Sequence, residues 1–365
     1  MDASPRAVMR RTGLPILAGL ALTLAAVRAT ARERDTWSFV VGGDSRNCGD
    51  VVMPAVAAGA RAAGALFYWH LGDFRAIYDF DQDVVAARRD AARPLTISDY
   101  LRTAWDDFIE NQLSPFGSIP VYLAIGNHET ISPKTRAEYL AQFADWLNAA
   151  PIARQRLADD PKDHRLKTYY HWVQNGIDFV TLDNATPDQF DAEQIRWFEG
   201  VVKRDAADLS VRAIVVGMHA ALPDSRAAGH SMNDAAQGEQ SGRRVYADLL
   251  HAQAAGKRVY VLASHSHFYM ADLFDTPYWR AHGGVLPGWI IGTTGAVRYA
   301  LPEGVMEGES ARTNLYGYLL GTVSPDGSIR FEFREIRRAA IPPETVTRFS
   351  APFVDQCFDA NRQNP

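Results

Sequence analysis

The sequence predicts an α/β protein whose strands form more than one β-sheet. Short apolar runs of strand length alternate with helix-like stretches through the first two thirds of the chain, and further strand-like runs gather near its end. Such alternation is typical of sheets covered by helices. Several apolar runs end directly in Gly-Asp, Asn-His or other His-containing segments, which indicates that one end of a sheet carries a functional site.

The composition is that of an ordinary globular protein. The 365 residues suffice for one large α/β domain or two small ones, with 47% hydrophobic and 22% charged residues. The formal net charge is −5. Nucleic-acid binding needs a clustered basic face, and none stands out, so no nucleic-acid partner is indicated.

The first 31 residues have the pattern of a targeting segment. Three arginines precede an uncharged apolar stretch at 13–27, and Ala29-Thr30-Ala31 provides a cleavage site with small residues. This apolar stretch of 15 residues is short for a bilayer span, which needs about 20. We therefore expect a cleaved signal peptide over 1–31 and an exported protein, periplasmic or secreted, without a stable membrane span. Twin-arginine export and an uncleaved anchor stay as alternatives.

The two cysteines, Cys48 and Cys357, lie near opposite ends of the mature chain. An exported protein permits a disulfide between them, but the sequence does not show how far apart they lie. Two cysteines are too few for a zinc cluster of thiolates. We expect one domain over 37–340 and a peripheral C-terminal tail over 341–365.

Three apolar runs predict buried strands in the first part of the chain, at 37–42, 65–71 and 121–125. An Ala-rich stretch predicts a helix over 51–63 with Pro54 in its first turn. Apolar residues at helical spacing predict another helix over 97–113. Residues 75–98 are polar and irregular, and we expect an insertion or a lid over one face there.

The middle of the chain predicts a helix over 135–148, a charged loop as far as Lys167, and then a hairpin. The hairpin joins runs 169–173 and 177–182 through Asn175-Gly176, because Asn-Gly tolerates positive φ. The remaining expected elements are helices at 191–208 and 243–255, strands at 211–218, 259–263 and 289–293, a mobile loop at 229–242, and a final hairpin of 317–323 with 329–335.

Polar side chains that bind metals follow five of the expected strands: Asp44, Asp73, Asn127-His128, His219 and His265-x-His267. One such residue alone is usually a turn or cap residue, but five in this order indicate a site, because the carboxyl ends of strands line one crevice. Carboxylate, amide and imidazole donors suit Mn²⁺, Fe or Zn²⁺. They are too many for one tetrahedral ion and fit two ions about 3.5–4 Å apart that share a carboxylate.

Five short motifs carry these residues: Gly43-Asp44-Ser45-Arg46, Gly72-Asp73, Gly126-Asn127-His128-Glu129, Gly217-Met218-His219 and Ser264-His265-Ser266-His267. As a set, which spans residues 37–295, they resemble the motifs of the calcineurin-like metallophosphoesterases. The resemblance implies a four-layer αββα sandwich, in which two packed mixed sheets are flanked by helices. It also implies hydrolysis of phosphate esters by a hydroxide that bridges two metal ions.

The resemblance further implies a role for each residue. Asp73 would bridge the two ions, and His128 would lie beside them as a general acid or a phosphate-binding group. The remaining ligands would divide between the ions, with Asp44 and His267 on the first and Asn127, His219 and His265 on the second.

The chain departs from the family pattern at the first motif, where Arg46 replaces a histidine and so leaves the first ion one protein ligand short. A charged arginine cannot ligate a metal, but its fork binds phosphate bidentately. We hypothesise that Arg46 clamps the substrate phosphate while water completes the coordination of the ion. Ser264 replaces a glycine, which is a milder change. Ala76 stands where purple acid phosphatases have a tyrosine, so a tyrosinate–iron site is not expected.

Two alternatives to an exported enzyme stay open. One is a secreted metal- or phosphate-binding protein of the same fold that has lost catalysis. The other is a membrane-anchored phosphatase that acts on phospholipids. Substrate selectivity is expected to lie in segments 75–98, 225–242 and 275–288, while the substrate, the metal and the oligomeric state do not follow from the sequence.

Overall fold

A computed structural model describes residue 1 and residues 36–89, 91–185, 189–227 and 229–363. The expected signal peptide over 1–31, apart from Met1, lies outside the described residues. Residues Trp37–Pro365 form one compact unit, so the expected tail over 341–365 belongs to the same unit as 37–340. Among the described helices, none is both long enough and apolar enough to cross a bilayer.

The first sheet joins the beginning of this unit to its end. Its five strands run in the order β12-β11-β1-β2-β3. Strands β1, β2 and β3 are parallel, whereas β11 is antiparallel to both β1 and β12. Their bounds are Trp37–Gly42 for β1, Tyr68–His70 for β2, Val121–Leu123 for β3, Tyr316–Val323 for β11 and Ile329–Ile336 for β12.

The second sheet has seven strands in the order β10-β8-β9-β7-β6-β5-β4. Strands β5, β6, β7 and β9 are parallel, β4 is antiparallel to β5, and β8 is antiparallel to both β9 and β10. Asn175 and Gly176 both have positive φ, which confirms the expected hairpin turn. The bounds are Tyr170–Gln174 for β4, Ile177–Thr181 for β5, Ala213–Gly217 for β6, Arg258–Ala263 for β7, Tyr269–Met270 for β8, Gly288–Ile291 for β9 and Ala311–Arg312 for β10.

Aromatic side chains hold the two sheets face to face. The ring of Phe179 on β5 lies 5.0 Å from the ring of Phe39 on β1 and 5.0 Å from that of Phe67, both edge to face. All three are buried, and edge-to-face aromatic pairs stabilise beyond the area that they bury. The expected architecture of two packed mixed sheets is confirmed.

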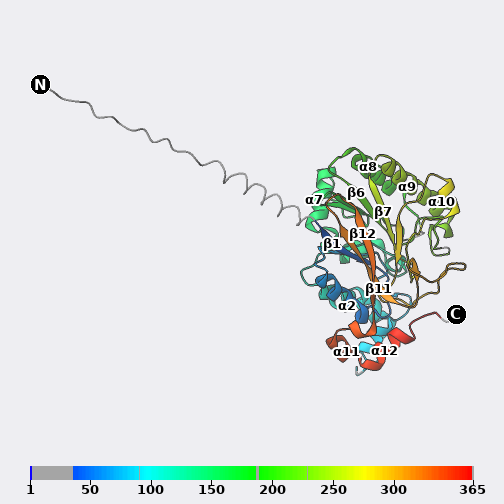
Figure 1. The fold of residues 1–365 in the computed structure, drawn as a ribbon. Coiled ribbons are helices and arrows are strands. Elements are labelled where there is room, and N and C mark those ends of the chain that lie inside the picture. Colours follow the sequence, from blue (N-terminus) through cyan, green and yellow to red (C-terminus); the bar gives the residue numbers. More distant parts are fainter. Residues whose placement is uncertain (2–35, 90, 186–188, 228, 364–365) are drawn as a thin grey trace. The chain divides into compact units, whose positions relative to one another are not determined.

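Helices cover both outer faces (Figure 1). Over the second sheet, α8 (Ala192–Ala207) and α9 (Ala236–Ala254) share a buried apolar cluster with β5, β6 and β7. Asp191 caps α8, because its carboxylate accepts a hydrogen bond from the N–H of Gln194 at 2.8 Å. On the opposite side lie α2 (Gly49–Ala62), α3 (Gln82–Ala87), α11 (Pro343–Phe349) and α12 (Ala351–Asp359).

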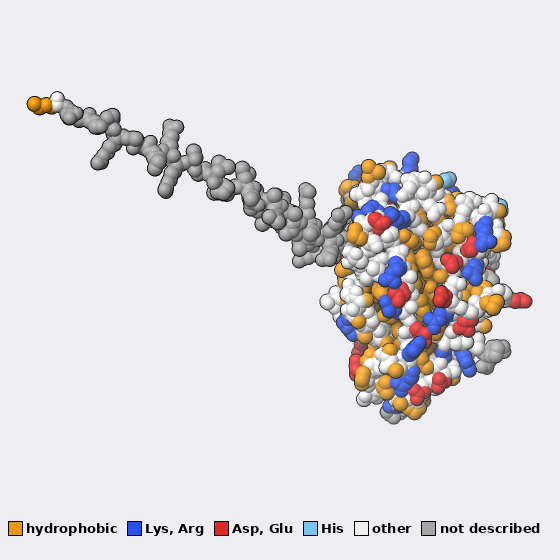
Figure 2. Space-filling model, viewed as in Figure 1, with side chains coloured by type: hydrophobic (Ala, Val, Ile, Leu, Met, Phe, Trp, Pro, Cys, Tyr) orange, Lys and Arg blue, Asp and Glu red, His pale blue; other side chains and the backbone are white. Residues whose placement is uncertain are grey.

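The other helices are α4, α5, α6, α7 and α10. Helix α4 continues as a π-helical turn, Ile109–Leu113, which confirms the expected helix over 97–113. The bounds are Ile97–Phe108 for α4, Arg136–Gln142 for α5, Ala144–Leu147 for α6, Ala150–Asp159 for α7 and Pro277–Ala281 for α10. On the face drawn in Figure 2, basic and acidic side chains are interspersed.

Three expectations about local structure were wrong. Helix α2 begins at Gly49, so Pro54 lies inside it rather than in its first turn. The expected charged loop before Lys167 contains α7. The expected mobile loop over 229–242 instead contains the start of α9, because Gly242 serves close packing: a Cβ there would lie 2.4 Å from the ring of Pro223.

The segment over 75–98 is only partly the expected lid. Arg75, Asp81 and Asp83 are fully buried. The Arg75 guanidinium donates to Asp50 at 2.6 Å and to Asp83 at 3.1 Å. Charged residues that the sequence suggested were on the surface therefore form an ion cluster inside the protein. Buried charges require such partners.

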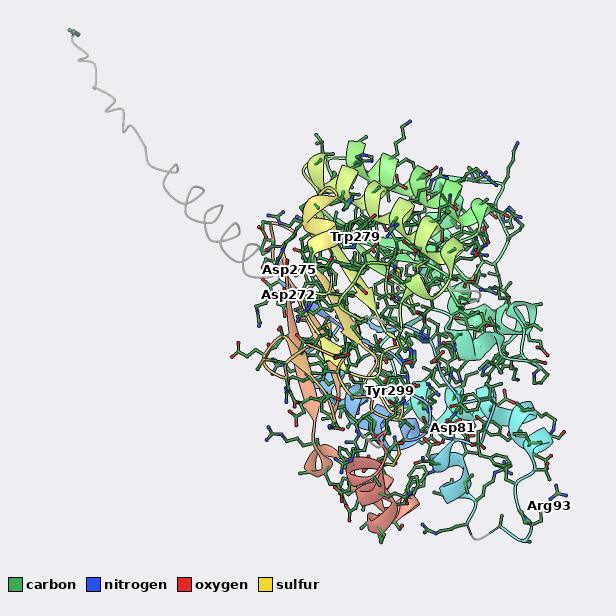
Figure 3. The ribbon with its side chains drawn as sticks, turned by 90° about the vertical axis from the view of Figure 1, so that its right-hand side faces the viewer. Asp81, Arg93, Asp272, Asp275, Trp279 and Tyr299 are labelled. Carbon is green, nitrogen blue, oxygen red and sulfur yellow. A yellow bond between two sulfur atoms is a disulfide. The ribbon has the colours of Figure 1, made fainter. Side chains whose placement is uncertain are left out.

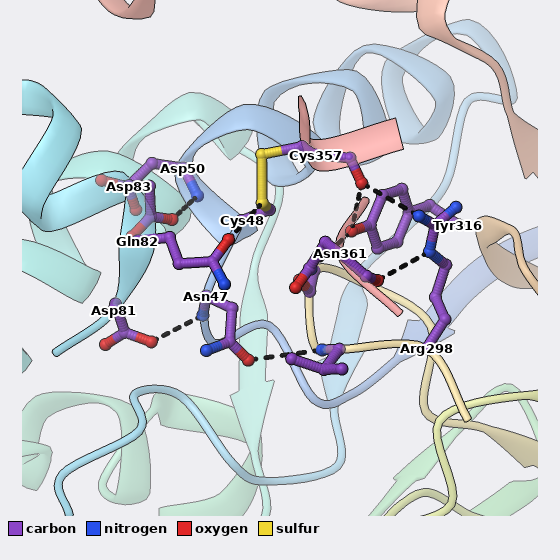
Figure 4. Close-up of a disulfide and its surroundings, with 12 residues drawn as sticks. Asn47, Cys48, Asp50, Asp81, Gln82, Asp83, Arg298, Tyr316, Cys357 and Asn361 are labelled. Carbon is purple, nitrogen blue, oxygen red and sulfur yellow. Dashed lines mark hydrogen bonds between the residues drawn. A yellow bond between two sulfur atoms is a disulfide. The ribbon is translucent and has the colours of Figure 1, made fainter. Parts of the chain in front are cut away.

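The C-terminal segment is tied to the core rather than peripheral. A disulfide joins Cys357 on α12 to Cys48 beside the first motif (Figure 4). Arg298 donates to the carbonyl oxygen of Cys357 at 3.2 Å, and Asn361 donates to the hydroxyl of Tyr316 at 2.7 Å. The segment therefore helps to hold the loop that carries Asp44.

Candidate metal centre

The six sequence-predicted metal ligands lie at the carboxyl ends of strands from both sheets. Asp44, Asp73 and Asn127 follow β1, β2 and β3, whereas His219 follows β6 and the remaining two histidines follow β7. Two groups of residues have ligand atoms that lie within 4.8 Å of one another. The first group is Asp44, Asp73 and His267, and the second group is Asp73, His219 and His265. Asp73 is common to both groups.

Sharp backbone turns aim these side chains at one another. Asp44, Asp73 and His265 have φ values of 58°, 61° and 65°, a left-handed conformation that is uncommon for residues other than glycine. Such strain tends to persist at functional sites. In a straight strand the rings of His265 and His267, two positions apart, would point to the same side, whereas the turn at His265 accompanies their placement in different ligand groups.

A glycine pair brings the loops after β2 and β3 together. Gly72 has a φ of 95°, and a Cβ at this position would lie 2.5 Å from the backbone nitrogen of Gly126. Only glycine permits this approach. It places Asn127 beside Asp73.

The second group, to which Asn127 contributes, consists of electron-pair donors that face one another. His219 Nδ1–H donates to the carbonyl oxygen of Leu71 at 2.9 Å, so Nε2 points into the group. Nε2 lies 2.9 Å from Asn127 Oδ1, 3.0 Å from His265 Nδ1 and 3.2 Å from Asp73 Oδ1. Lone pairs that face one another at these distances repel, and a cation bound among them removes this repulsion.

Two histidines of this group have pKa shifts in opposite directions. Burial opposes a charge on His219, but the Asp73 carboxylate outweighs burial and raises the pKa of His219 to about 9. Burial and the neighbouring His219 lower the pKa of His265 to about 3, which keeps its ring neutral. Neutral imidazole and carboxylate are the forms that bind metal ions, so a metal ion must displace the proton that Asp73 favours on His219.

The first group has a similar arrangement around Asp44 and His267. His267 Nδ1–H donates to the carbonyl oxygen of Val297 at 2.6 Å, and its Nε2 lies 3.1 Å from Asp44 Oδ1. The other oxygen of Asp44 accepts from the N–H of His265 at 2.8 Å and from the hydroxyl of Ser264. Burial raises the pKa of Asp44, but His267 outweighs burial and lowers it to about 2.

One atom between the groups has no hydrogen-bond partner among the described residues. Asp73 Oδ2 is buried and accepts nothing, although Asp73 Oδ1 accepts from the backbone N–H of His128 at 3.0 Å. A buried carboxylate oxygen without a donor is costly unless a cation reaches it. The donor set therefore fits metal ions on both sides of Asp73.

Comparison with known proteins decides the family. The region over residues 52–269 matches the model of the calcineurin-like phosphoesterases. The chain belongs to the calcineurin-like phosphoesterase family. It is accordingly a hydrolase that acts on phosphoric esters, and the family implies a centre of two divalent metal ions. Asp44 and Arg46 precede the matched region, which contains the other proposed site residues.

Solved structures of phosphatases share the fold. A purple acid phosphatase from yellow lupin (Lupinus luteus) seeds is 16% identical, with a TM-score of 0.51 over 82% of this chain. A dimetal phosphatase from Danio rerio is 12% identical, with a TM-score of 0.50 over 82% of this chain and 95% of its own. The alignment covers about half, 51%, of the lupin enzyme. No curated protein matches the chain.

His128, the histidine of the third motif in this phosphoesterase, lies beside the metal groups rather than within them. Its Nδ1–H donates to the carbonyl oxygen of Ala76 at 2.6 Å, so Nε2 is the atom that faces the site. Nε2 lies 3.6 Å from Asp73 Oδ2. Burial lowers the pKa of His128, which leaves the ring neutral in this arrangement.

Arg46 reaches into the first group. Its Nη2 donates to His267 Nε2 at 3.1 Å, its Nη1 donates to the Tyr78 hydroxyl at 3.2 Å, and its Nε lies 3.8 Å from Asp73 Oδ2. The side chain is 7% exposed. Burial opposes its charge, but the Asp73 carboxylate keeps the pKa of Arg46 above its usual value.

Sequence reasoning missed three residues around this centre. Glu129, the last residue of the third motif, is fully buried and accepts three backbone N–H groups. The ring of Tyr299 stacks on His267 at 3.9 Å and on His230 at 5.2 Å. Only Glu129 carried a sequence signal, because it belongs to a motif; Tyr299 and His230 stand in segments without one.

Part of the segment over 275–288, which was expected to select substrate, is structural. Trp279 is buried and stacks on Tyr246 at 3.6 Å. Its indole N–H donates to the carbonyl oxygen of Pro223 at 3.0 Å. Figure 3 shows Trp279 on α10, apart from Tyr299, which agrees with a packing role.

Proposed function

We propose that this phosphoesterase is an exported enzyme that hydrolyses phosphate esters, with two metal ions that the residues around Asp73 would hold and that would activate the attacking water. The observation that carries the proposal is that Asp73 belongs to both ligand groups. Its two oxygens have different surroundings, since Oδ1 lies 3.2 Å from His219 Nε2 and Oδ2 has no hydrogen-bond partner among the described residues.

The proposed ligands follow from the two groups. Asp44 and His267 hold the first ion, and Asn127, His219 and His265 hold the second, with Asp73 shared. Oxygen and imidazole donors without thiolate suit Mn, Fe or Zn. When bound, the ions supply chemistry by lowering the pKa of a water molecule so that a hydroxide forms near neutral pH.

The side chains of this protein complete the reaction. The oxygen of the attacking water bonds to phosphorus as the ester P–O bond breaks, and the leaving alkoxide needs a proton. We assign that proton to His128 Nε2, because the bond from Nδ1 to Ala76 holds the other ring nitrogen. An anionic phosphate beside the ring favours its protonated form and so offsets the effect of burial.

Arg46 is assigned to the phosphate. Its guanidinium carries five N–H donors, and a planar fork binds phosphate oxygens bidentately. Its Nη1 contacts Tyr78, whose side chain is exposed, so the guanidinium lies on the open side of the centre. Charge that develops on the phosphoryl oxygens would be stabilised there.

Export is supported by two independent features. The pattern of residues 1–31 is that of a cleaved signal, and the Cys48–Cys357 disulfide suits an oxidising compartment. The mass of the mature protein tests this proposal directly. A chain that begins near Arg32 supports export, whereas retention of the apolar stretch at 13–27 would favour the membrane-anchored alternative.

The enzyme is tested with purified mature protein, whose metal content is measured before assays on a phosphomonoester and a phosphodiester with added Mn²⁺. Turnover of either ester together with bound metal is expected. Asp73→Asn is the matched variant, because asparagine tolerates the positive φ at this position, and it should lose both metal and turnover. Bound metal without turnover of either ester would favour the non-catalytic binding protein instead.

A further inference from the structure

In the first group, Arg46 contacts an atom that a metal ion would need as a ligand. His267 Nδ1 is engaged with the carbonyl oxygen of Val297, so Nε2 is the ring nitrogen available for a metal. The lone pair of that same Nε2 accepts a hydrogen bond from Arg46 Nη2 at 3.1 Å. One lone pair cannot serve a guanidinium and a metal ion at the same time.

Arg46 also supplies the positive charge that this group requires. The Arg46 Nε lies 3.8 Å from Asp73 Oδ2, and the side chain is almost fully buried. A guanidinium stays charged at every pH at which the protein is folded. An ion that enters the first group must therefore displace the hydrogen bond to His267 and overcome repulsion from a nearby cation.

No guanidinium competes with a metal ion for His219 among the described contacts of the second group. His219 Nε2 faces Asn127, His265 and Asp73, and no arginine or lysine donates to it among the described contacts. The second group also has four donors against three, because the amide oxygen of Asn127 joins Asp73, His219 and His265. The two groups thus differ in ligand number, and an arginine contacts the first group.

The direction in which the Arg46 guanidinium can move away from His267 is towards Tyr78. Arg46 Nη1 already donates to the Tyr78 hydroxyl, and Tyr78 is 63% exposed. On the other side, the Tyr299 ring covers His267. A rotation of the guanidinium away from His267 therefore carries it towards the exposed side chain of Tyr78.

We propose that Arg46 and the first metal ion compete for His267, so that the second group fills first and the first group binds its ion more tightly when Arg46 turns to bind phosphate. This inference rests on the proposed function and adds an order of assembly to it. Because binding free energies are reciprocal, phosphate should strengthen binding of the first ion, and the first ion should strengthen binding of phosphate.

The test is a metal titration of metal-free protein with Mn²⁺, in the presence and absence of inorganic phosphate, with bound metal counted after equilibrium dialysis. The wild-type protein should bind one ion tightly and a second at least about 10-fold more weakly, and phosphate should reduce this gap. Arg46→Ala should strengthen the weaker site about 10-fold, leave the tighter site unchanged and abolish the effect of phosphate.

Two further variants make the result specific. Arg93→Ala removes the same charge from an exposed arginine, which Figure 3 shows away from Tyr299, and should change neither site. Arg46→Lys keeps the charge without the fork, and it should keep the weaker site weak while losing most of the phosphate effect. If circular dichroism shows that Arg46→Ala does not fold, Arg46→Lys tests the inference in its place.

Two outcomes would overturn the inference: equal tight binding of both ions by the wild type, or a first-site affinity that Arg46→Ala leaves unchanged. The titration needs no turnover. An inactive protein with the expected binding pattern would therefore contradict the proposed function alone, and an active enzyme with two equal sites would contradict this inference alone.

Discussion

The backbone N–H of Asp73 donates to Glu129 Oε2 at 2.8 Å and so joins the loop after β2 to the loop after β3. The same Oε2 accepts from the N–H of Gly126, and Oε1 accepts from the N–H of Phe74, each at 2.8 Å. Glu129 is fully buried. A carboxylate that is not itself a proposed ligand therefore holds the backbone of the residue that both metal groups share.

Replacement of Glu129 by Gln should weaken both folding and metal binding. The new NH₂ group faces backbone N–H donors and leaves at least one of them unpaired, which should cost about 1–3 kcal/mol of unfolding free energy. Metal affinity should fall about 10–100-fold, as expected for a group that orients a ligand. Urea unfolding and a metal titration measure the two effects, and unchanged values for both would show that Glu129 is dispensable.

Replacement of His128 by Ala should lower turnover about 10²–10⁴-fold while the metal content stays the same. The loss should be larger for an alkyl phosphate than for a nitrophenyl phosphate, because a good leaving group needs no proton. Steady-state assays with both esters, alongside metal analysis, check this. Loss of metal from the variant would instead identify His128 as a ligand.

Removal of the disulfide should destabilise the domain. Cys48 and Cys357 are 309 positions apart, so the link constrains almost the whole unfolded chain. Cys357→Ser should lower the unfolding free energy by about 2–5 kcal/mol. A reductant should lower the stability of the wild type towards that of the variant and leave the variant unaffected; equal effects on both proteins would point to another cause.

Stability should fall as the pH rises above neutrality, because of a buried histidine far along the chain from the metal motifs. His171 contacts Asp178 on β5 at 2.7 Å and Asp159 on α7 at 2.6 Å, and Arg204 on α8 also donates to Asp159. Burial opposes the charge of His171, but Asp178 and Asp159 outweigh burial and raise its pKa from 6.5 to about 10.

Since the folded protein holds this proton more tightly than the unfolded chain, the contribution of His171 is complete below about pH 6.5 and is lost as the pH approaches about 10. Asp205, a neighbour of Asp178, acts in the same direction, because burial and Asp178 raise its pKa to about 9. Unfolding free energies measured between these pH values should decrease. His171→Gln should flatten the decrease; an identical slope in the variant would assign it to other groups.

The layers of the fold and the positions of the motifs could be predicted because their signals are local. Apolar runs placed β1, β3 and β7, and Asn175-Gly176 identified the hairpin of β4 and β5. Signals failed where packing overrides composition. The start of α9 carries the glycine and polar residues of a loop, yet Gly242 is needed there for contact with Pro223.

By itself the sequence determined the strands that carry the motifs, the family and the set of side chains at the strand ends, since these depend on neighbours along the chain. Only the tertiary structure decided that Cys48 meets Cys357, that Arg46 donates to His267, and that Tyr299 covers the same ring. Arg46 and His267 are 221 residues apart. Periodicity and motif spacing do not predict such contacts. The contacts form because the two sheets pack together and the loops at the carboxyl ends of their strands meet in one region.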